Sequence, residues 1–522
     1  MYYLFTGGDL VKRILVFITL ISLMTGLYGC FNDRDDNDYV DYQQFTVIHN
    51  EINDALPLYF NQDILLPQFD DAEVTWKIDD QSMTTILLYQ PPIINKETEV
   101  HVDITIDDTT ISYTFPMIVL APDSALNQNV MRIEVDIPIE HVTKETYRNA
   151  AVHVDSVVNG ELHTVFENNQ VEIRGRGNST WGMPKKPYRL KFADDVSILG
   201  MPAARNYVLL AEYADKSLLR NTIAYKFSGM LENIEHAAST RVVEVYFNGA
   251  YHGVYTLTEH MEVHENKLFI GSNPGHHNTG YFMELDQRFD QHGKEVGVDG
   301  IRVAGIPYVF KEPTPHDDLT SRQVEFMDNY IRVMENTLIH KDGYEYYMDV
   351  DNFIDYFIVQ ELFKNVDVGW GSVFFYKRPN EVLRMGPIWD FDLAMGNANY
   401  IDYGPENWYG MRNHKNRWFQ LMMGIPDIRD RFKARYIELY SHEIPLLLEA
   451  VGQLGNAMIP LAERNFTRWD RLGHYDWPNP HEMVEATTYQ EQVDYLYHYI
   501  KARADWMYYA VQSENYAQGI FD

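Results

Sequence analysis

The chain has 522 residues, of which 76 are acidic and 43 are basic, so its formal net charge is -33. This charge argues against binding to nucleic acid or to anionic lipid headgroups, because both would repel the protein. The hydrophobic content of 45% is ordinary for a folded soluble protein, and the length predicts two or more domains.

The N-terminal residues have the pattern of a secretory signal. Lys12 and Arg13 precede an apolar run, Ile14–Leu27, which is too short for a confident transmembrane span. The run ends in Leu-Tyr-Gly-Cys, and Cys30 is the only cysteine of the chain. This ending resembles the bacterial lipobox, which implies that residues 1–30 are a lipoprotein signal peptide and that Cys30 carries the lipid. The alternative is an ordinary signal peptide in which the cysteine is incidental.

Residues 31–122 are expected to form a tether and a small β-module. The polar, acidic segment 31–41 is typical of a flexible tether. Residues 42–122 contain short, alternating, β-branched runs, which predict a small β-sandwich. Glu73-Val-Thr-Trp76 resembles bacterial surface immunoglobulin-like modules. No catalytic pattern stands out there, so a spacer role is expected, with carbohydrate or protein binding as the alternative.

Residues 131–512 are expected to form an α+β domain, because strands come first and helices later. Helices are predicted at about Leu218–Leu231, Ser321–His340 and Val350–Lys364, and much of the chain beyond Asn416 has helical periodicity. The predicted strands are Met131–Ile137, Ala151–Val158, Val171–Arg174, Tyr188–Phe192, Val242–Phe247, Gly253–Glu259 and Tyr281–Leu285.

A predicted hairpin brings three aspartates together. The sequence pattern predicts two strands, Ser372–Lys377 and Val382–Trp389, joined by a turn that contains Pro-Asn. Asp367 precedes the hairpin and Asp390 and Asp392 follow it, so the carboxylates should meet at its open end. Because many aromatic residues surround them, we interpret the cluster as a metal or catalytic site. The alternative is an acidic loop on the surface of an acidic protein.

Other segments carry weaker signals. Arg174–Trp181 (RGRGNSTW) is rich in glycine and could turn backbone N–H groups toward an anion, although a tight turn is the commoner explanation. Lys191 could point into a site or into solvent, and Glu259 could be the partner of a site lysine or an exposed strand end. Asp215 reads as a helix cap. The 19 histidines form no zinc-binding motif.

Five ordered motifs between about Met131 and Tyr509 resemble the CotH kinase family, that is, spore coat protein H and its relatives. They are RGRGNSTWGMPKKPYRLKF, LLAEYADKSLLRNTIAYKFS, VEVYFNGAYHGVYTLTEHMEV, NVDVGWGSVFFYK and GPIWDFDLAMGN. The resemblance implies an atypical protein-kinase-like fold that phosphorylates protein serines with ATP and magnesium. It further implies that Asp367 is catalytic and that Asp390, with Asp392, binds the metal. The candidate nucleotide-binding residues are Arg174, Asn178, Ser179, Lys186, Lys191 and Glu259.

One position departs from the family pattern. Many members have asparagine five positions after the catalytic aspartate, where this chain has Ser372. A serine hydroxyl can ligate magnesium, but less dependably than an amide oxygen. The leading hypothesis is a kinase that is anchored to the outer face of a bacterial membrane and acts on a Ser-rich protein. The alternative is a non-catalytic pseudokinase that binds a cell-wall polymer or a protein, and a compartment poor in ATP would favour it.

Overall fold

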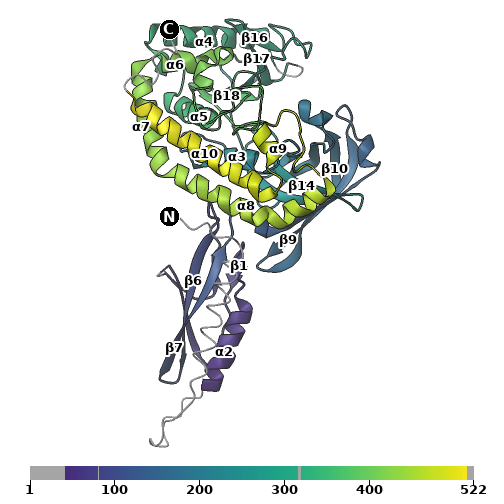
Figure 1. Cartoon of the computed structure of the whole chain (residues 1–522), viewed down its shortest axis with the longest axis vertical. Coiled ribbons are helices and arrows are strands. Elements are labelled where there is room, and N and C mark those ends of the chain that lie inside the picture. The colour runs from purple at the N-terminus through teal and green to yellow at the C-terminus, as the bar shows by residue number, and fades with distance from the viewer. Residues whose placement is uncertain (1–41, 80, 316–318, 514–522) are drawn as a thin grey trace, which may run out of the picture. The chain divides into compact units, whose positions relative to one another are not determined.

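A computed structural model describes residues 42–79, 81–315 and 319–513 (Figure 1). The expected signal peptide, the tether and Cys30 lie outside the described residues. The chain divides into two compact units. We call N-terminal unit the part up to Ala121 together with Val157–Leu162, and C-terminal unit the part formed by Pro122–Ser156 and the chain from His163 onward.

The N-terminal unit is one helix and two sheets. Strands β1, β7, β6, β3 and β4 form a five-stranded sheet in this order, and β2 pairs with β5. The elements are α2 (Tyr42–Ala55), β1 (Tyr59–Phe60), β2 (Ile64–Leu65), β3 (Glu73–Ile78), β4 (Gln81–Met83), β5 (Ile86–Leu87), β6 (Lys96–Ile106) and β7 (Thr109–Val119).

The helix α2 corrects the expected β-sandwich over residues 42–122. Phe45, Ile48 and Ile52 recur at helical spacing along α2 and are buried in one core with Trp76 and Val102. Since a single apolar stripe of this kind fits a helix and not a strand, the unit is a helix packed with a sheet rather than an immunoglobulin-like sandwich.

The C-terminal unit has the expected α+β composition and begins with a closed seven-stranded barrel. The strands follow one another around the barrel in the order β10-β11-β12-β14-β13-β8-β9. In β11 the side chains of Tyr188, Leu190 and Phe192 point into the barrel core, as their alternation predicts. The strands are β8 (Asn129–Val135), β9 (Arg148–Val158), β10 (Glu161–Gly175), β11 (Tyr188–Val196), β12 (Ala204–Leu210), β13 (Thr240–Phe247) and β14 (Ala250–Glu259).

A second sheet, of five strands, carries the predicted hairpin. Its order is β16-β17-β15-β18-β19. Its strands are β15 (Tyr281–Leu285), β16 (Gly300–Val303), β17 (Ile306–Glu312), β18 (Val373–Lys377) and β19 (Leu383–Met385). The hairpin β18–β19 is confirmed, with Phe375 opposite Met385. However, β19 ends four residues before the expected Trp389, because the next residues are Gly386, whose φ is 125°, and Pro387, which has no N–H to donate.

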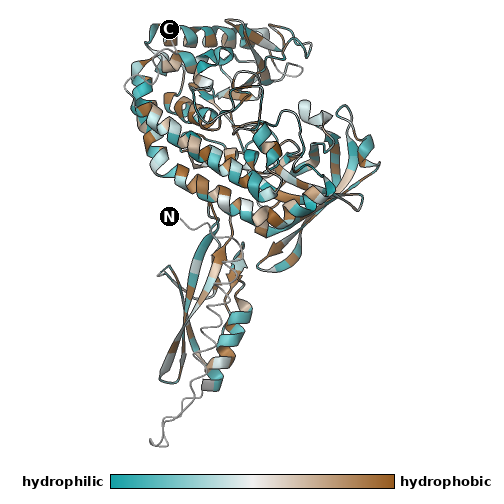
Figure 2. Ribbon diagram, in the orientation of Figure 1, coloured by the Kyte–Doolittle hydropathy of each residue, from teal (hydrophilic) through white to brown (hydrophobic). Residues whose placement is uncertain are grey.

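Helices pack on both the barrel and the second sheet. They are α3 (Arg220–Met230), α4 (Ser321–His340), α5 (Val350–Leu362), α6 (Arg417–Met423), α7 (Pro426–Ser441), α8 (Glu443–Arg468), α9 (His481–Glu485) and α10 (Tyr489–Gln512). Helices α8 and α10 run side by side, and hydrophobic and hydrophilic residues intermix along both (Figures 1 and 2). Helix α8 is long and apolar enough to cross a membrane, but Leu447, Val451 and Met458 place its apolar face in the protein core.

Candidate active site

The hairpin β18–β19 positions the predicted carboxylates at one cleft. Asp367 precedes β18, and its backbone N–H donates to Asn365 Oδ1 at 3.1 Å, which fixes the turn that presents its carboxylate. Asp390 and Asp392 follow β19, and all three aspartates line a cleft of about 560 Å³. The cleft lies between the barrel and the second sheet, because its other walls come from the β10–β11 loop and from β15 and β17. The sequence therefore predicted this meeting of carboxylates correctly.

The carboxylates are held in an unfavourable electrostatic environment. Burial, and after it the charge of Asp390, raise the pKa of Asp367 to about 7, while Arg288 opposes this shift. Burial also raises the pKa of Asp392 well above its usual range, and the nearby Asp390 and Glu212 add to this. Groups buried among like charges ionise with difficulty, so the cleft favours ligands that supply positive charge.

Ser372 lies within this carboxylate cluster. Its hydroxyl donates to Asp390 Oδ2 at 3.1 Å, and its backbone N–H donates to Glu284 Oε1 at 3.1 Å. Both Ser372 and Asp390 have left-handed backbone conformations, with φ of 56° and 67°. Such conformations cost non-glycine residues about 1–3 kcal/mol and are typical of functional sites. Their pairing here shows that the surrounding structure imposes this local geometry.

The segment that follows Asp390 is tied to helix α3. The side chain of Asn221 accepts a hydrogen bond from the Phe391 N–H at 2.7 Å. Its amide group donates to both carboxylate oxygens of Glu212 at 3.1 Å. Asn221 therefore links the backbone beside Asp390 to a buried carboxylate of the barrel.

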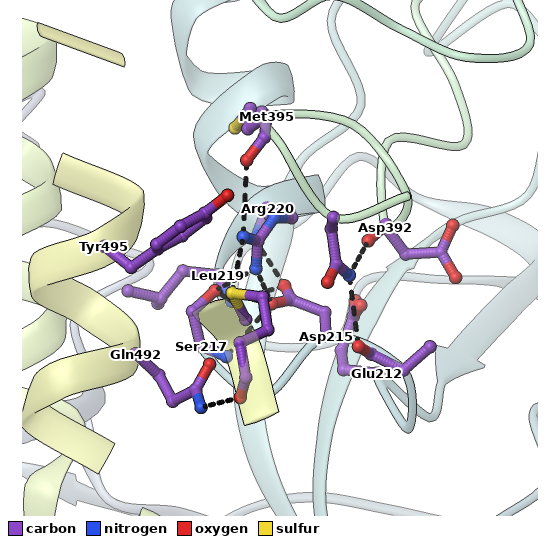
Figure 3. Close-up of polar contacts among 12 residues, drawn as sticks. Glu212, Asp215, Ser217, Leu219, Arg220, Asp392, Met395, Gln492 and Tyr495 are labelled. Atoms are coloured by element: carbon purple, nitrogen blue, oxygen red, sulfur yellow. Dashed lines mark hydrogen bonds and ion pairs between the residues drawn. The ribbon is translucent and has the colours of Figure 1, made fainter. Parts of the chain in front are cut away.

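A buried ion pair reinforces this link (Figure 3). Arg220 and Asp215 are fully buried and form an ion pair, and Arg220 Nε also donates to the Ala394 carbonyl at 3.1 Å. Asp215 accepts hydrogen bonds from the backbone N–H groups of Leu219 and Arg220, at 3.1 and 2.8 Å. The predicted cap residue therefore does bind N–H groups at the start of α3, although the N-cap position itself is Leu219. Arg220 thus fixes the loop after Asp392 to the start of α3.

The glycine-rich segment forms the loop between β10 and β11. Its residues from Arg176 to Thr180 line the cleft, which includes the predicted Asn178 and Ser179. Gly177 has a φ of 85°, and a Cβ there would lie 2.2 Å from Thr180 Oγ1, so the loop requires glycine. Arg176 lies 5.5 Å from the centre of the Trp389 ring, and burial lowers its pKa while Asp390 and Asp392 oppose the shift.

Lys185, rather than the predicted Lys186 or Lys191, lines the cleft. Lys185 is 1% exposed and donates to the Val254 carbonyl and to Asn465 Oδ1. Burial lowers the pKa of Lys185 to about 7, and Glu212 opposes this; burial raises the pKa of Glu212 to about 7. The cleft therefore contains a buried lysine and a buried glutamate, and each is near its titration midpoint at neutral pH.

The structure places Lys186 and Lys191 outside the cleft lining. Lys186 Nζ donates to the Trp181 backbone carbonyl at 2.7 Å and lies 4.7 Å from the centre of the Trp181 ring. Lys191 points outward and pairs with Glu172 at 3.1 Å. Lys191 takes this direction because it follows Leu190, which faces the barrel core.

Arg174 and Glu259 also lie outside the cleft lining. Arg174 stacks on the Tyr147 ring, with its guanidinium carbon 4.6 Å from the ring centre. Glu259 is fully buried, where it pairs with His236 at 3.1 Å and accepts from the Ser239 N–H at 2.8 Å. The expected partnership of Glu259 with a site lysine is replaced by this histidine contact.

The sequence analysis missed several charged residues of the cleft. Arg288 pairs with Asp286 at 2.7 Å, and Lys311 pairs with Glu284 at 3.0 Å. These four residues come from β15, β17 and the loop after β15, which the resemblance motifs do not cover. Glu284 was the one with a usable hint, because it is a carboxylate within a strand whose other residues are apolar.

The described residues contain no group of three potential ligands that could hold a metal by themselves. Magnesium, however, is bound in phosphate-transferring sites through one or two carboxylates together with substrate phosphates. Asp390, with Asp392 and Ser372 beside it, has this donor chemistry, and the mutual repulsion of the carboxylates favours a divalent cation. The residues present therefore fit magnesium.

The fold and the cleft together define an α+β protein with a carboxylate-rich site facing a glycine-rich loop. A family model described as CotH kinase protein matches residues 173–507, which is more than half of the chain. The chain therefore belongs to the CotH kinase family. No curated protein matches it.

Proposed function

We propose that this protein is an ATP- and magnesium-dependent protein serine kinase of the CotH type, with an atypical kinase-like fold. The observation that carries the proposal is the meeting of Asp367, Asp390 and Asp392 in one cleft with Arg176 and the glycine-rich loop. A carboxylate before a hairpin and another after it is also the arrangement by which protein kinases place their catalytic base and their metal ligand.

In the proposed reaction Asp367 accepts the proton of the substrate serine. The serine oxygen forms a bond to the γ-phosphorus of ATP, and the bond between this phosphorus and the bridging oxygen breaks, so that ADP leaves. A pKa of about 7 suits a general base at neutral pH, because the carboxylate is then partly ionised and basic enough to take a proton.

The remaining residues have distinct proposed roles. Asp390, Asp392 and Ser372 would hold magnesium, which would neutralise phosphate charge when bound. The N–H groups of the loop at Asn178 and Ser179 would face the phosphates, and Arg176 and Lys185 would supply positive charge.

Transfer of labelled phosphate from ATP to a Ser-rich protein tests this proposal. The wild-type chain is expected to transfer phosphate only with magnesium. Asp367→Asn should reduce the rate by about 10²–10⁴-fold, the usual contribution of a general base, and Asp390→Ala should abolish magnesium-dependent transfer. Unchanged turnover in both variants would sink the assignment.

We further propose that the protein is anchored to the outer face of a bacterial membrane by lipid on Cys30. The support is the lipobox-like Leu-Tyr-Gly-Cys sequence that ends the apolar run. Metabolic labelling with a fatty acid tests this proposal. The wild-type protein should incorporate the label and be found in the membrane fraction. The Cys30→Ala variant should carry no label and should no longer be found in the membrane fraction.

The second candidate is a pseudokinase that binds a cell-wall polymer or a protein partner. Ser372 favours it, since its short hydroxyl already donates to Asp390 where the family pattern has asparagine. Nucleotide binding separates the two candidates. If millimolar ATP with magnesium does not raise the unfolding temperature, the pseudokinase becomes the better-supported hypothesis.

A further inference from the structure

A second cleft, of about 790 Å³, adjoins the first one at Asp367. Asp367, Trp370, Tyr400 and Trp477 line both clefts, so the proposed base lies at their junction. The first cleft contains the glycine-rich loop and the proposed metal ligands, whereas the second contains none of them. A group held in the second cleft would thus approach Asp367 from the side away from the nucleotide.

The three aromatic residues at this junction are unusually exposed. Trp370, Tyr400 and Trp477 are 39%, 50% and 57% exposed. The rings of Tyr400 and Trp477 stack on each other, with centroids 5.8 Å apart and an interplanar angle of 15°. Aromatic rings that gather on the surface around a reacting group are typical of a recognition surface, because they bury much area with little loss of side-chain freedom.

The rim of the second cleft is positively charged. Arg412 and Lys415 are exposed, and neither forms an ion pair within the part of the chain that the structure describes. Lys415 Nζ lies 4.6 Å from the centre of the Trp370 ring, which keeps the cation beside the aromatic surface. The acidic Asp402 of the same cleft already has a partner, Lys364, at 3.6 Å. A chain with a net charge of -33 thus presents two free cations beside its proposed base.

Resting on the proposed kinase function, we propose that this second cleft is the acceptor site and that it binds an extended peptide segment with acidic residues next to the serine. The aromatic surface would pack against the peptide, and Arg412 and Lys415 would pair with its carboxylates. The serine hydroxyl would then lie at Asp367, which takes its proton. Charge complementarity selects an acidic peptide over a basic one, since like charges on the rim would repel a lysine-rich segment.

Peptide binding to the full chain tests this inference without requiring catalysis. Three labelled peptides share one serine and differ only in whether aspartate, asparagine or lysine flanks it, and fluorescence anisotropy reports their affinities. The aspartate peptide is expected to bind about tenfold more tightly than the asparagine peptide, the ratio expected of two exposed ion pairs. The lysine peptide should bind most weakly, and the differences should shrink as salt is raised.

Charge reversal at the rim provides the matched comparison. The double variant Arg412→Glu and Lys415→Glu should invert the order, so that the lysine peptide binds best. A control with the same change in net charge, Arg322→Glu and Lys433→Glu, alters cations that line neither cleft and should keep the wild-type order. A cooperative thermal unfolding transition without added ligand shows that each variant is folded.

The outcomes distinguish this inference from the kinase proposal. If the affinities follow the expected order and invert with the rim, but no phosphate is transferred, the binding site for an acidic peptide stands and the kinase proposal fails. If phosphate is transferred while the three peptides bind equally, or the order survives charge reversal, the inference is overturned. Competition for the labelled aspartate peptide gives a further test. The inference is also overturned if a neutral oligosaccharide displaces this peptide while an excess of unlabelled aspartate peptide does not.

Discussion

Replacing Asp367 by asparagine should stabilise the protein while it removes the proposed base. The asparagine keeps nearly the same shape but has no charge to bury. In the wild-type protein, burial and the charge of Asp390 raise the pKa of Asp367 to about 7 from a usual value of 3.8. The ionised carboxylate is therefore disfavoured in the folded protein relative to the unfolded chain.

The sign of the pH dependence follows from these two pKa values. Below pH 4 the group is protonated in both states and costs nothing. Between pH 4 and pH 7 only the unfolded chain ionises, so the folded protein loses stability as pH rises, and above pH 7 the loss is constant. Three pKa units correspond to about 4 kcal/mol, and because the side chain borders a water-filled cleft, we expect about half of this, ~2 kcal/mol, at pH 8.

Urea denaturation of the wild type and Asp367→Asn at pH 5 and pH 8, with EDTA to exclude metal ions, measures this effect. Asp367→Asn should be more stable by about 2 kcal/mol at pH 8 and by less than about 1 kcal/mol at pH 5. Asp430→Asn is the matched control, because Asp430 is an exposed residue of α7, and it should change stability by less than about 0.5 kcal/mol at both values.

Two results would refute this reasoning. One is a difference between Asp367→Asn and the wild type that is the same at pH 5 and pH 8, which would mean that ionisation of Asp367 carries no cost. The other is a loss of stability in Asp367→Asn at pH 8, which would mean that the carboxylate is a favourable structural partner and not a strained group.

Three further predictions concern the surroundings of the site. Ser372→Asn should lower the magnesium concentration needed for half-maximal phosphate transfer. Asparagine tolerates the left-handed conformation at this position, and its side-chain oxygen reaches further than the serine hydroxyl. An unchanged magnesium dependence would show that residue 372 has a structural role and does not bind the metal. Arg220→Ala should lower the free energy of unfolding by about 3–5 kcal/mol in urea denaturation, because it removes the cation that pairs with the buried Asp215. A loss below about 1 kcal/mol would show that the loop after Asp392 is held by other contacts. Gly396→Ala should lower the free energy of unfolding by more than about 2 kcal/mol, because its φ is 76° and a Cβ there would lie 2.6 Å from the Tyr499 ring. The control Gly452→Ala, in an open part of α8, should raise the free energy of unfolding by about 0.5–1 kcal/mol. Equal effects of the two substitutions would contradict the clash at Gly396.

Local patterns in the sequence were sufficient to predict the elements that carry the aspartates. Pro379 and Asn380 form the turn of the hairpin, and Asn380 adopts the left-handed conformation that such a turn uses. The helix predicted at about Ser321–His340 has these bounds in the structure, where Thr320 and Gln323 form a complete capping box at its start. Where the signal is a short-range one of this kind, sequence and structure agree.

The prediction failed where the deciding contacts are long-range. Helix α2 was missed within the expected β-sandwich because its apolar residues, Phe45, Ile48 and Ile52, are few and lie among polar and β-branched neighbours. Only the sheet on which the helix packs reveals their common face. Lys185 was passed over for Lys186 because the two are adjacent and alike in sequence. Only the fold shows that Lys185 is enclosed by the Val254 carbonyl and Asn465, which lie far along the chain.

The three groups with a pKa of about 7 give the cleft a common property. Asp367 and Glu212 resist ionisation, and Lys185 resists protonation, all chiefly through burial. A divalent cation lowers the pKa of nearby carboxyl groups, and a phosphate raises the pKa of a nearby ammonium group. Under the proposed function, the carboxylates that ionise would balance the charge of magnesium, and a protonated Lys185 would balance the charge of the phosphates. Magnesium and nucleotide should bind to this cleft more tightly together than either binds alone, because the cation and the phosphates would attract each other directly within it.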